Sequence, residues 1–157
     1  MPCEYCNGAT LVLISFWFMD LTNTFPRSPF EKLGGMIWIP RLTDKARAKL
    51  KNKLGEYVYD CPMDQRALKF LGIGADAFLS AVSSAADDKA MLEWIGANAV
   101  KRSPAAIEEF NKMLSNLGPS TPDSQTKFAA TRDKIAAGRT DVTTWAMMID
   151  LEEGRLK

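Results

Sequence analysis

Start signals for helices recur along the chain, and they constrain its fold more than any other feature. Ser103-Pro104 and Thr121-Pro122 each place a side-chain oxygen just before a proline, which is typical of a helix N-terminus. Asp87 can cap a further helix in the same way. Apolar residues follow these starts at helical spacing, and glycine or Gly-Pro ends the runs. The pattern predicts an all-α fold, a single compact bundle-like domain of six to eight helices.

We expect most helices to begin at a recognisable residue, with buried apolar side chains along one face. The last helix is expected to begin with Asp141 as its cap and to end at Gly154. The remaining expected starts are Thr43 or Leu42, Pro62, Ala75, Asp87, Ser103-Pro104 and Thr121-Pro122.

The first start signal is ambiguous. Ser28-Pro29-Phe30-Glu31 has the form of a capping box and predicts a helix that Pro40 kinks or ends. The pair Gly34-Gly35 weakens this helix, so a short strand at residues 36–39 is the competing interpretation.

Composition sets bounds on partners and chemistry. A chain of 157 residues, 46% hydrophobic and 25% charged, has enough apolar surface for one core and is short for two. The net charge of +1 creates no large field of one sign, so we expect no nucleic-acid or membrane partner. The chain has no histidine, which removes the commonest general base and metal ligand. Catalysis would therefore rest on carboxylates, Tyr, Lys, Ser, Thr or Cys.

Three cysteines are too few for a disulfide-stapled secreted scaffold, and a reducing cytoplasm is the simplest location. Cys3 and Cys6 form a C-x-x-C pair, which is half of a zinc site or a redox pair. With Cys61 as the only further thiol, a zinc site would need a carboxylate or a second chain. We predict no metal and no cofactor.

The N-terminal residues 1–18 stand apart from the rest. The apolar run from Ala9 to Met19 is about half the length that spans a bilayer, and no Lys or Arg precedes it. It is either an element of the core or an extension upstream of a natural start at Met19, and we favour the extension. The predicted domain therefore comprises residues 19–157.

The stretch from Phe25 to Leu71 concentrates charged and aromatic residues between apolar ones. Arginine offers a fork of donors and tyrosine an aromatic face with a polar tip, so this stretch can line a pocket for a small polar or anionic molecule. The alternative interpretation is that Asp44, Lys45 and Arg47 form a solvated helix face. The candidate ligand-binding residues are Arg41, Lys45, Tyr57, Tyr59 and Arg66.

Carboxylates in the same stretch suggest a hydrolase as a rival function. Two carboxyl groups in unlike environments can divide the roles of general acid and general base. The candidate catalytic residues are Asp44, Glu56, Asp60 and Asp64. A second set of polar residues lies near the C-terminus. These residues could join the same site, or they could be helix caps and surface ion pairs. They are Arg132, Asp133, Arg139, Asp141, Asp150, Glu152 and Arg155.

Several of these segments together resemble a known family. The segments are Phe25-Pro26-Arg27-Ser28-Pro29, Lys32-Leu33-Gly34-Gly35, Asp44-Lys45-Ala46-Arg47-Ala48, Leu54-Gly55-Glu56-Tyr57, Asp64-Gln65-Arg66, Gly138-Arg139-Thr140-Asp141 and Asp150-Leu151-Glu152-Glu153-Gly154-Arg155. In these segments the chain is similar to a bacterial family known as domain of unknown function 5069, from about Asp20 onward. The resemblance implies no activity, cofactor or catalytic residue.

Three functions follow as hypotheses. The leading one is a cytoplasmic helical domain that binds a small polar or anionic ligand. The oligomeric state stays open, and a homodimer is possible. The second is a histidine-independent hydrolase, of glycosidase or esterase type, that uses paired carboxylates. The third is a protein-interaction module with an exposed apolar patch, for which Trp17, Phe18, Trp38 and Trp94 are the candidates.

Overall fold

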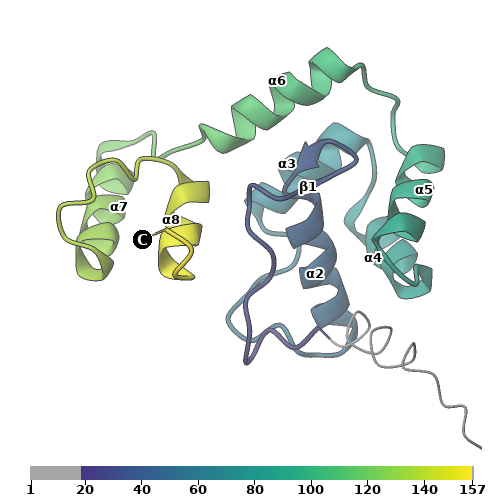
Figure 1. Ribbon diagram of the computed structural model, residues 1–157, viewed down its shortest axis with the longest axis horizontal. Coiled ribbons are helices and arrows are strands. Elements are labelled where there is room, and N and C mark those ends of the chain that lie inside the picture. The colour runs from purple at the N-terminus through teal and green to yellow at the C-terminus, as the bar shows by residue number, and fades with distance from the viewer. Residues whose placement is uncertain (1–18, 157) are drawn as a thin grey trace, which may run out of the picture. The chain divides into compact units, whose positions relative to one another are not determined.

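The computed structural model describes residues 19–156, and most of these residues are helical (Figure 1). The two strands are short and pair with each other only. This confirms the prediction of an all-α fold, while the Cys3-x-x-Cys6 pair and the apolar run up to Phe18 lie outside the described residues. The elements are β1 (Lys32–Leu33), β2 (Met36–Ile37), α2 (Ile39–Leu50), α3 (Pro62–Leu71), α4 (Ala75–Ser84), α5 (Asp88–Asn98), α6 (Pro104–Ser115), α7 (Pro122–Ile135) and α8 (Trp145–Glu152).

The described chain folds into two compact units. Unit 1 consists of residues 19–24 and Leu42–Ala99, and therefore holds α3, α4, α5 and most of α2. Unit 2 consists of Phe25–Arg41 and residues 100–156, with the hairpin, the first turn of α2 and helices α6, α7 and α8. In the described part of the chain, no single helix has the length and apolar character to cross a bilayer.

The capping-box signal at Ser28 does not start a helix, and that prediction is wrong. Glu31 accepts from the Ser28 amide at 3.3 Å, and the Ser28 hydroxyl accepts from the Phe30 amide at 3.2 Å, but the chain continues into the β1–β2 hairpin. Gly34 and Gly35 connect the strands with φ of 59° and 80°. Two successive residues with positive φ match the twist of a tight hairpin turn, and glycine adopts them without strain.

Helix α2 begins earlier than expected, at Ile39. Pro40 lies in its first turn, where a missing amide costs no helical hydrogen bond, so it neither kinks nor ends the helix. Trp38 precedes the helix with a positive φ of 70° and is buried, so it does not contribute to an exposed patch.

The helices of unit 1 agree closely with the sequence pattern. Asp87 caps α5 by accepting from the Ala90 amide at 2.8 Å, as predicted. Helices α4 and α5 lie side by side in Figure 1. Buried apolar side chains from all four helices include Leu42, Ala46, Leu68, Leu71, Phe78, Val82, Met91 and Ile95. Leu50, in contrast, is 42% exposed at the end of α2.

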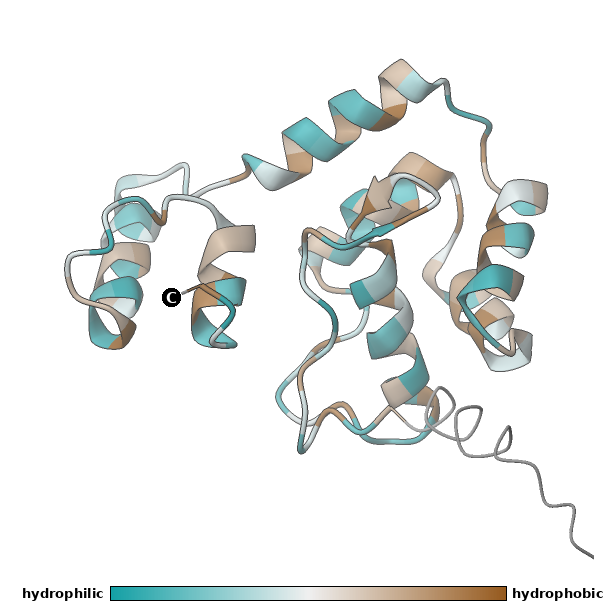
Figure 2. Ribbon diagram, viewed as in Figure 1, coloured by the Kyte–Doolittle hydropathy of each residue, from teal (hydrophilic) through white to brown (hydrophobic). Residues whose placement is uncertain are grey.

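Unit 2 contains two helices that start as predicted and one that does not. Ser103 caps α6 and Thr121 caps α7, and brown and teal residues alternate along α6 in Figure 2. Asp141 does not cap the last helix, because Thr144 accepts from the Met147 amide instead. Helices α7 and α8 pack through a small apolar core of Phe128, Val142, Met148 and Leu151.

Candidate functional site

Helix α2 carries four charged side chains that are almost completely buried. Arg41, Asp44, Lys45 and Arg47 are each 7% exposed or less. The interpretation of residues 44, 45 and 47 as a solvated helix face is therefore wrong. Charged groups are rarely buried unless they are paired, so the partners of these four residues determine what the helix can do.

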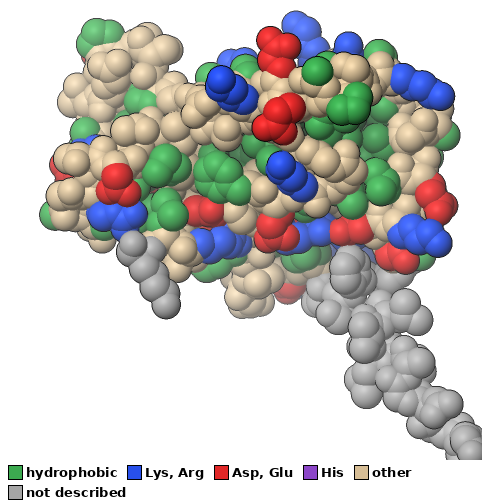
Figure 3. All heavy atoms as spheres, turned by 45° about the horizontal axis from the view of Figure 1, so that its top comes forward, with side chains coloured by type: hydrophobic (Ala, Val, Ile, Leu, Met, Phe, Trp, Pro, Cys, Tyr) green, Lys and Arg blue, Asp and Glu red, His purple; other side chains and the backbone are tan. Residues whose placement is uncertain are grey.

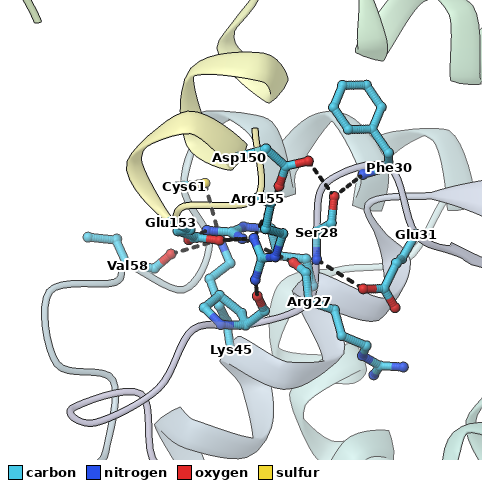
Figure 4. Close-up of polar contacts among 12 residues, drawn as sticks. Arg27, Ser28, Phe30, Glu31, Lys45, Val58, Cys61, Asp150, Glu153 and Arg155 are labelled. Carbon is cyan, nitrogen blue, oxygen red and sulfur yellow. Dashed lines mark hydrogen bonds and ion pairs between the residues drawn. The ribbon is translucent and has the colours of Figure 1, made fainter. Parts of the chain in front are cut away.

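Lys45 is held in a small polar cluster with Asp64 and Cys61. Its ammonium donates to Asp64 Oδ2 at 2.7 Å. It also donates to the Val58 carbonyl at 3.1 Å and to Cys61 Sγ at 3.4 Å (Figure 4). Asp64 has no exposed surface and also accepts from the Cys61 amide at 3.2 Å. An ammonium has three donors, and all three are used here. This pair links α2 to the first turn of α3.

Arg47 lies two residues further along α2, between two carboxylates. Its guanidinium is 3.3 Å from Asp88, in the first turn of α5, and 3.8 Å from Asp44. Arginine held by carboxylates on both sides keeps a fixed position because several charge-assisted contacts restrict it. The same side chain forms part of the wall of a pocket.

This pocket, which we call the α2–α4 pocket, has a volume of about 200 Å³ and combines cationic and apolar walls. Arg47 and Lys51 supply positive charge from the end of α2, and Ser83 supplies a hydroxyl. The remaining lining residues are apolar: Leu50, Val82, Ala85 and Ala86. A second hollow of about 430 Å³ has uncharged walls that include Ser80, Ser84 and Trp94.

Lys51 differs from Arg47 in its surroundings. It is exposed, and within the described residues it takes part in no ion pair. Its charge is thus available to a ligand in the α2–α4 pocket. On the face drawn in Figure 3, basic and acidic side chains are interspersed.

Unit 2 has its own network of buried charges, centred on Glu153. Glu153 forms two hydrogen bonds with Arg41, at 2.7 and 3.0 Å, and both side chains are about 95% buried. Arg41 also donates to the Arg27 carbonyl at 3.0 Å, and its guanidinium lies 5.8 Å from the centre of the Trp38 ring. The Arg41–Glu153 pair therefore joins the first turn of α2 to the end of α8.

The network continues through Arg155 to Ser28. Arg155 contacts Glu153 and Asp150, the latter at 3.1 Å, and donates to the Pro26 carbonyl at 2.5 Å. Ser28 donates to Asp150 at 2.7 Å, and Figure 4 shows the two side chains pointing toward each other. These contacts fasten the segment before the hairpin to the C-terminal turn of unit 2.

The other polar residues near the C-terminus form surface pairs. Arg132 pairs with Asp133, and Arg139 pairs with Asp141, both at 2.9 Å. The guanidinium of Arg139 lowers the pKa of the Asp141 carboxyl by donating to it.

The residues that we predicted as one site take part in different contacts. Lys45 and Asp64 pair with each other in unit 1, whereas Arg41 belongs to the network of unit 2. Asp44 is buried beside Arg47. The exposed predicted residues are Glu56, Asp60 and Arg66, and Tyr57 is half-buried.

Tyr59 is buried, and its hydroxyl donates to the Ala75 carbonyl at 2.8 Å. Burial raises the pKa of Tyr59 well above its usual value, and the nearby carboxylates of Asp64, Asp60 and Asp76 raise it further. Tyr59 therefore stays a neutral hydrogen-bond donor at all ordinary pH values.

Three residues of the α2–α4 pocket were missed from the sequence: Arg47, Lys51 and Ser83. Arg47 lies in the last turn of α2 and Lys51 directly follows that helix, four residues further on, and this spacing was the available signal. Ser83 lies on another helix and carries no such signal. Among the described residues, no group of three or more acidic or cysteine side chains is placed to hold a metal ion.

Residues 23–155 match the family described as "Domain of unknown function (DUF5069)". The chain belongs to this family. The match covers most of the chain and includes both the α2–α4 pocket and the Glu153 network, and it confirms the resemblance seen in the sequence. No curated protein matches the chain. The DUF5069 assignment carries no activity, so function has to be argued from the pocket itself.

Proposed function

We propose that unit 1 binds a small anion, most simply a short-chain carboxylate, in the α2–α4 pocket. The observation that carries the proposal is that Arg47 and Lys51 line a pocket whose other lining residues are largely apolar. A ligand with one anionic end and a short hydrocarbon tail complements both kinds of wall.

The two cationic side chains have different roles in this proposal. Arg47 is positioned by Asp44 and Asp88, which also offset much of its charge. Lys51 brings the uncompensated charge and is free to move toward a bound anion. The Ser83 hydroxyl donates to the Ser80 carbonyl at 2.6 Å, so the cationic groups are the donors that face a ligand.

Pocket size restricts the ligand to a few heavy atoms. A volume of about 200 Å³ corresponds to about seven water molecules at ~30 Å³ each. Butyrate and similar short carboxylates match this size, and Leu50 and Val82 supply apolar contact for their tails.

Binding is better supported than hydrolysis. Asp44 and Asp64 are at most 1% exposed, and each has an arginine or lysine beside it. A general acid or base must reach the proton that it transfers, directly or through one water molecule. Asp44 and Asp64 lack that access to a substrate, so we propose binding in place of hydrolysis at these two residues.

We also propose a cytoplasmic location, where the Cys61 thiol would stay reduced.

Calorimetric titration with butyrate, acetate and inorganic phosphate tests the proposal, with butylammonium as the ligand of opposite charge. Lys51→Gln should weaken butyrate binding about five- to tenfold, a loss of ~1–1.4 kcal/mol. The matched control is Lys69→Gln, which removes an exposed lysine at the end of α3 and should leave binding unchanged. Equal effects of the two variants, or equal binding of butylammonium, would rule the proposal out.

A further inference from the structure

We propose that Lys45 and Cys61 form a reversible covalent bridge in which one oxygen atom links Nζ to Sγ. The modification is a redox-dependent cross-link inside unit 1. It lies outside the α2–α4 pocket and does not depend on the proposed function.

Geometry sets this pair apart from an ordinary buried cysteine. Lys45 Nζ is 3.4 Å from Cys61 Sγ, which accepts one of its hydrogen bonds. The other two donors are fixed on the Val58 carbonyl and Asp64, so the ammonium has little freedom to turn away from the sulfur. Cys61 itself is only half-buried, whereas Lys45 is enclosed.

Asp64 supplies the proton acceptor that the reaction needs. Its Oδ2 lies 2.7 Å from Nζ and can take the proton that converts the ammonium into a nucleophilic amine. The same oxygen accepts from the Cys61 amide, so it is held beside both reacting groups.

The proposed oxidant is molecular oxygen, and the reaction balances. The thiol and the neutral amine each lose one hydrogen, one oxygen atom becomes the bridge, and the other leaves as water with both hydrogens. Sulfur and nitrogen each give up two electrons, and O₂ accepts four. Reversal takes four electrons, which two molecules of dithiothreitol supply as each forms its own disulfide. Sulfur returns to the thiol, nitrogen returns to the amine, and the bridging oxygen leaves as water.

Peptide mapping tests the bridge directly. In a chain with Cys3→Ser and Cys6→Ser, Cys61 is the remaining thiol, so no internal disulfide can form. After incubation in air-saturated buffer, trypsin should fail to cleave after Lys45. Residues 42–47 should then appear joined to residues 54–66, with the mass of both peptides plus one oxygen minus two hydrogens. Dithiothreitol should restore the separate peptides.

Two variants separate the bridge from simple thiol oxidation. Lys45→Arg retains the cation and Cys61→Ser retains a small polar side chain, and neither should give the joined peptide. Oxidised parent protein should also unfold at a higher temperature than the reduced form, because the cross-link ties α2 to the start of α3. The proposal is overturned if Cys61 becomes sulfinic acid or an intermolecular disulfide while cleavage after Lys45 stays normal. It is also overturned if the mass does not change.

Discussion

The Asp88 carboxylate lies 3.3 Å from the guanidinium of Arg47, and so the first turn of α5 holds one wall of the α2–α4 pocket in place. This contact positions Arg47, but it also places a negative charge near the proposed anion site. The two effects act in opposite directions on binding, and the charge effect can be tested separately because asparagine keeps the shape of the side chain.

We expect Asp88→Asn to strengthen butyrate binding about two- to fivefold, or ~0.4–1 kcal/mol, since like charges near an exposed site repel weakly. Calorimetric titration measures the change. Glu93→Gln is the control, because it removes the same charge from an exposed position on α5. Weaker binding by the Asp88 variant would show that positioning of Arg47 outweighs the repulsion and would contradict this prediction.

Breaking the Arg41–Glu153 pair should strongly destabilise unit 2. Arg41→Met leaves the buried Glu153 carboxylate without the arginine that donates to both of its oxygens, and we expect a loss of about 3 kcal/mol in the free energy of unfolding. Urea unfolding followed by circular dichroism gives the value. The exposed Arg139–Asp141 pair provides the comparison, since Arg139→Gln should cost below ~1 kcal/mol. Similar losses in the two variants would mean that burial of the first pair has no energetic importance.

Stability should fall at alkaline pH because of Tyr59. Its pKa is raised in the folded state, so the unfolded chain loses this proton first, near pH ~10. Above that pH the folded state binds more protons than the unfolded state, and the free energy of unfolding decreases as pH rises. Tyr59→Phe should cost about 1 kcal/mol at neutral pH through the lost bond to Ala75, and its decline above pH ~10 should be shallower. Parallel pH profiles for both proteins would exclude Tyr59 as the cause.

Two glycines with positive φ should differ in their tolerance of alanine. At Gly55 a Cβ atom would lie 2.6 Å from the Leu21 carbonyl oxygen, whereas at Gly138 it would meet open space. Gly138→Ala should therefore cost only the backbone strain, about 1 kcal/mol, and Gly55→Ala clearly more. Thermal unfolding of both variants provides the comparison, and an equal cost would indicate that the segment around Leu21 moves aside.

The capping residues in the sequence predicted the start of a helix correctly where the capping hydrogen bond joins residues close together in the chain. Ser103 and Thr121 cap their helices through an amide three residues away, and no distant contact competes within residues 19–156. Ser28 has the same kind of signal but fails as a helix start. Its hydroxyl donates a hydrogen bond to Asp150. The side chain of Asn111 accepts a hydrogen bond from the Ile37 amide and so stabilises the hairpin. Partners 74 and 122 residues away cannot be inferred from spacing along the chain.

The candidate site was harder to predict for the same reason. The sequence identified α2 as unusually rich in charge, but it could not distinguish paired burial from solvation. Lys45 is buried because Asp64 lies 19 residues further on, and Arg41 because Glu153 lies 112 further on. The pocket at Arg47 also needs Val82 from α4, a helix whose sequence pattern indicates only an apolar face.

The most direct test of the proposed function is an amide NMR titration of the full chain with butyrate. We expect the largest shift changes at Lys51, Ala85 and Ala86, which line the α2–α4 pocket, with saturation at one equivalent site and much smaller changes in Lys51→Gln. Shift changes that are spread over both units, or that gather around Arg139 and other exposed arginines, would contradict the assignment of the α2–α4 pocket as an anion site.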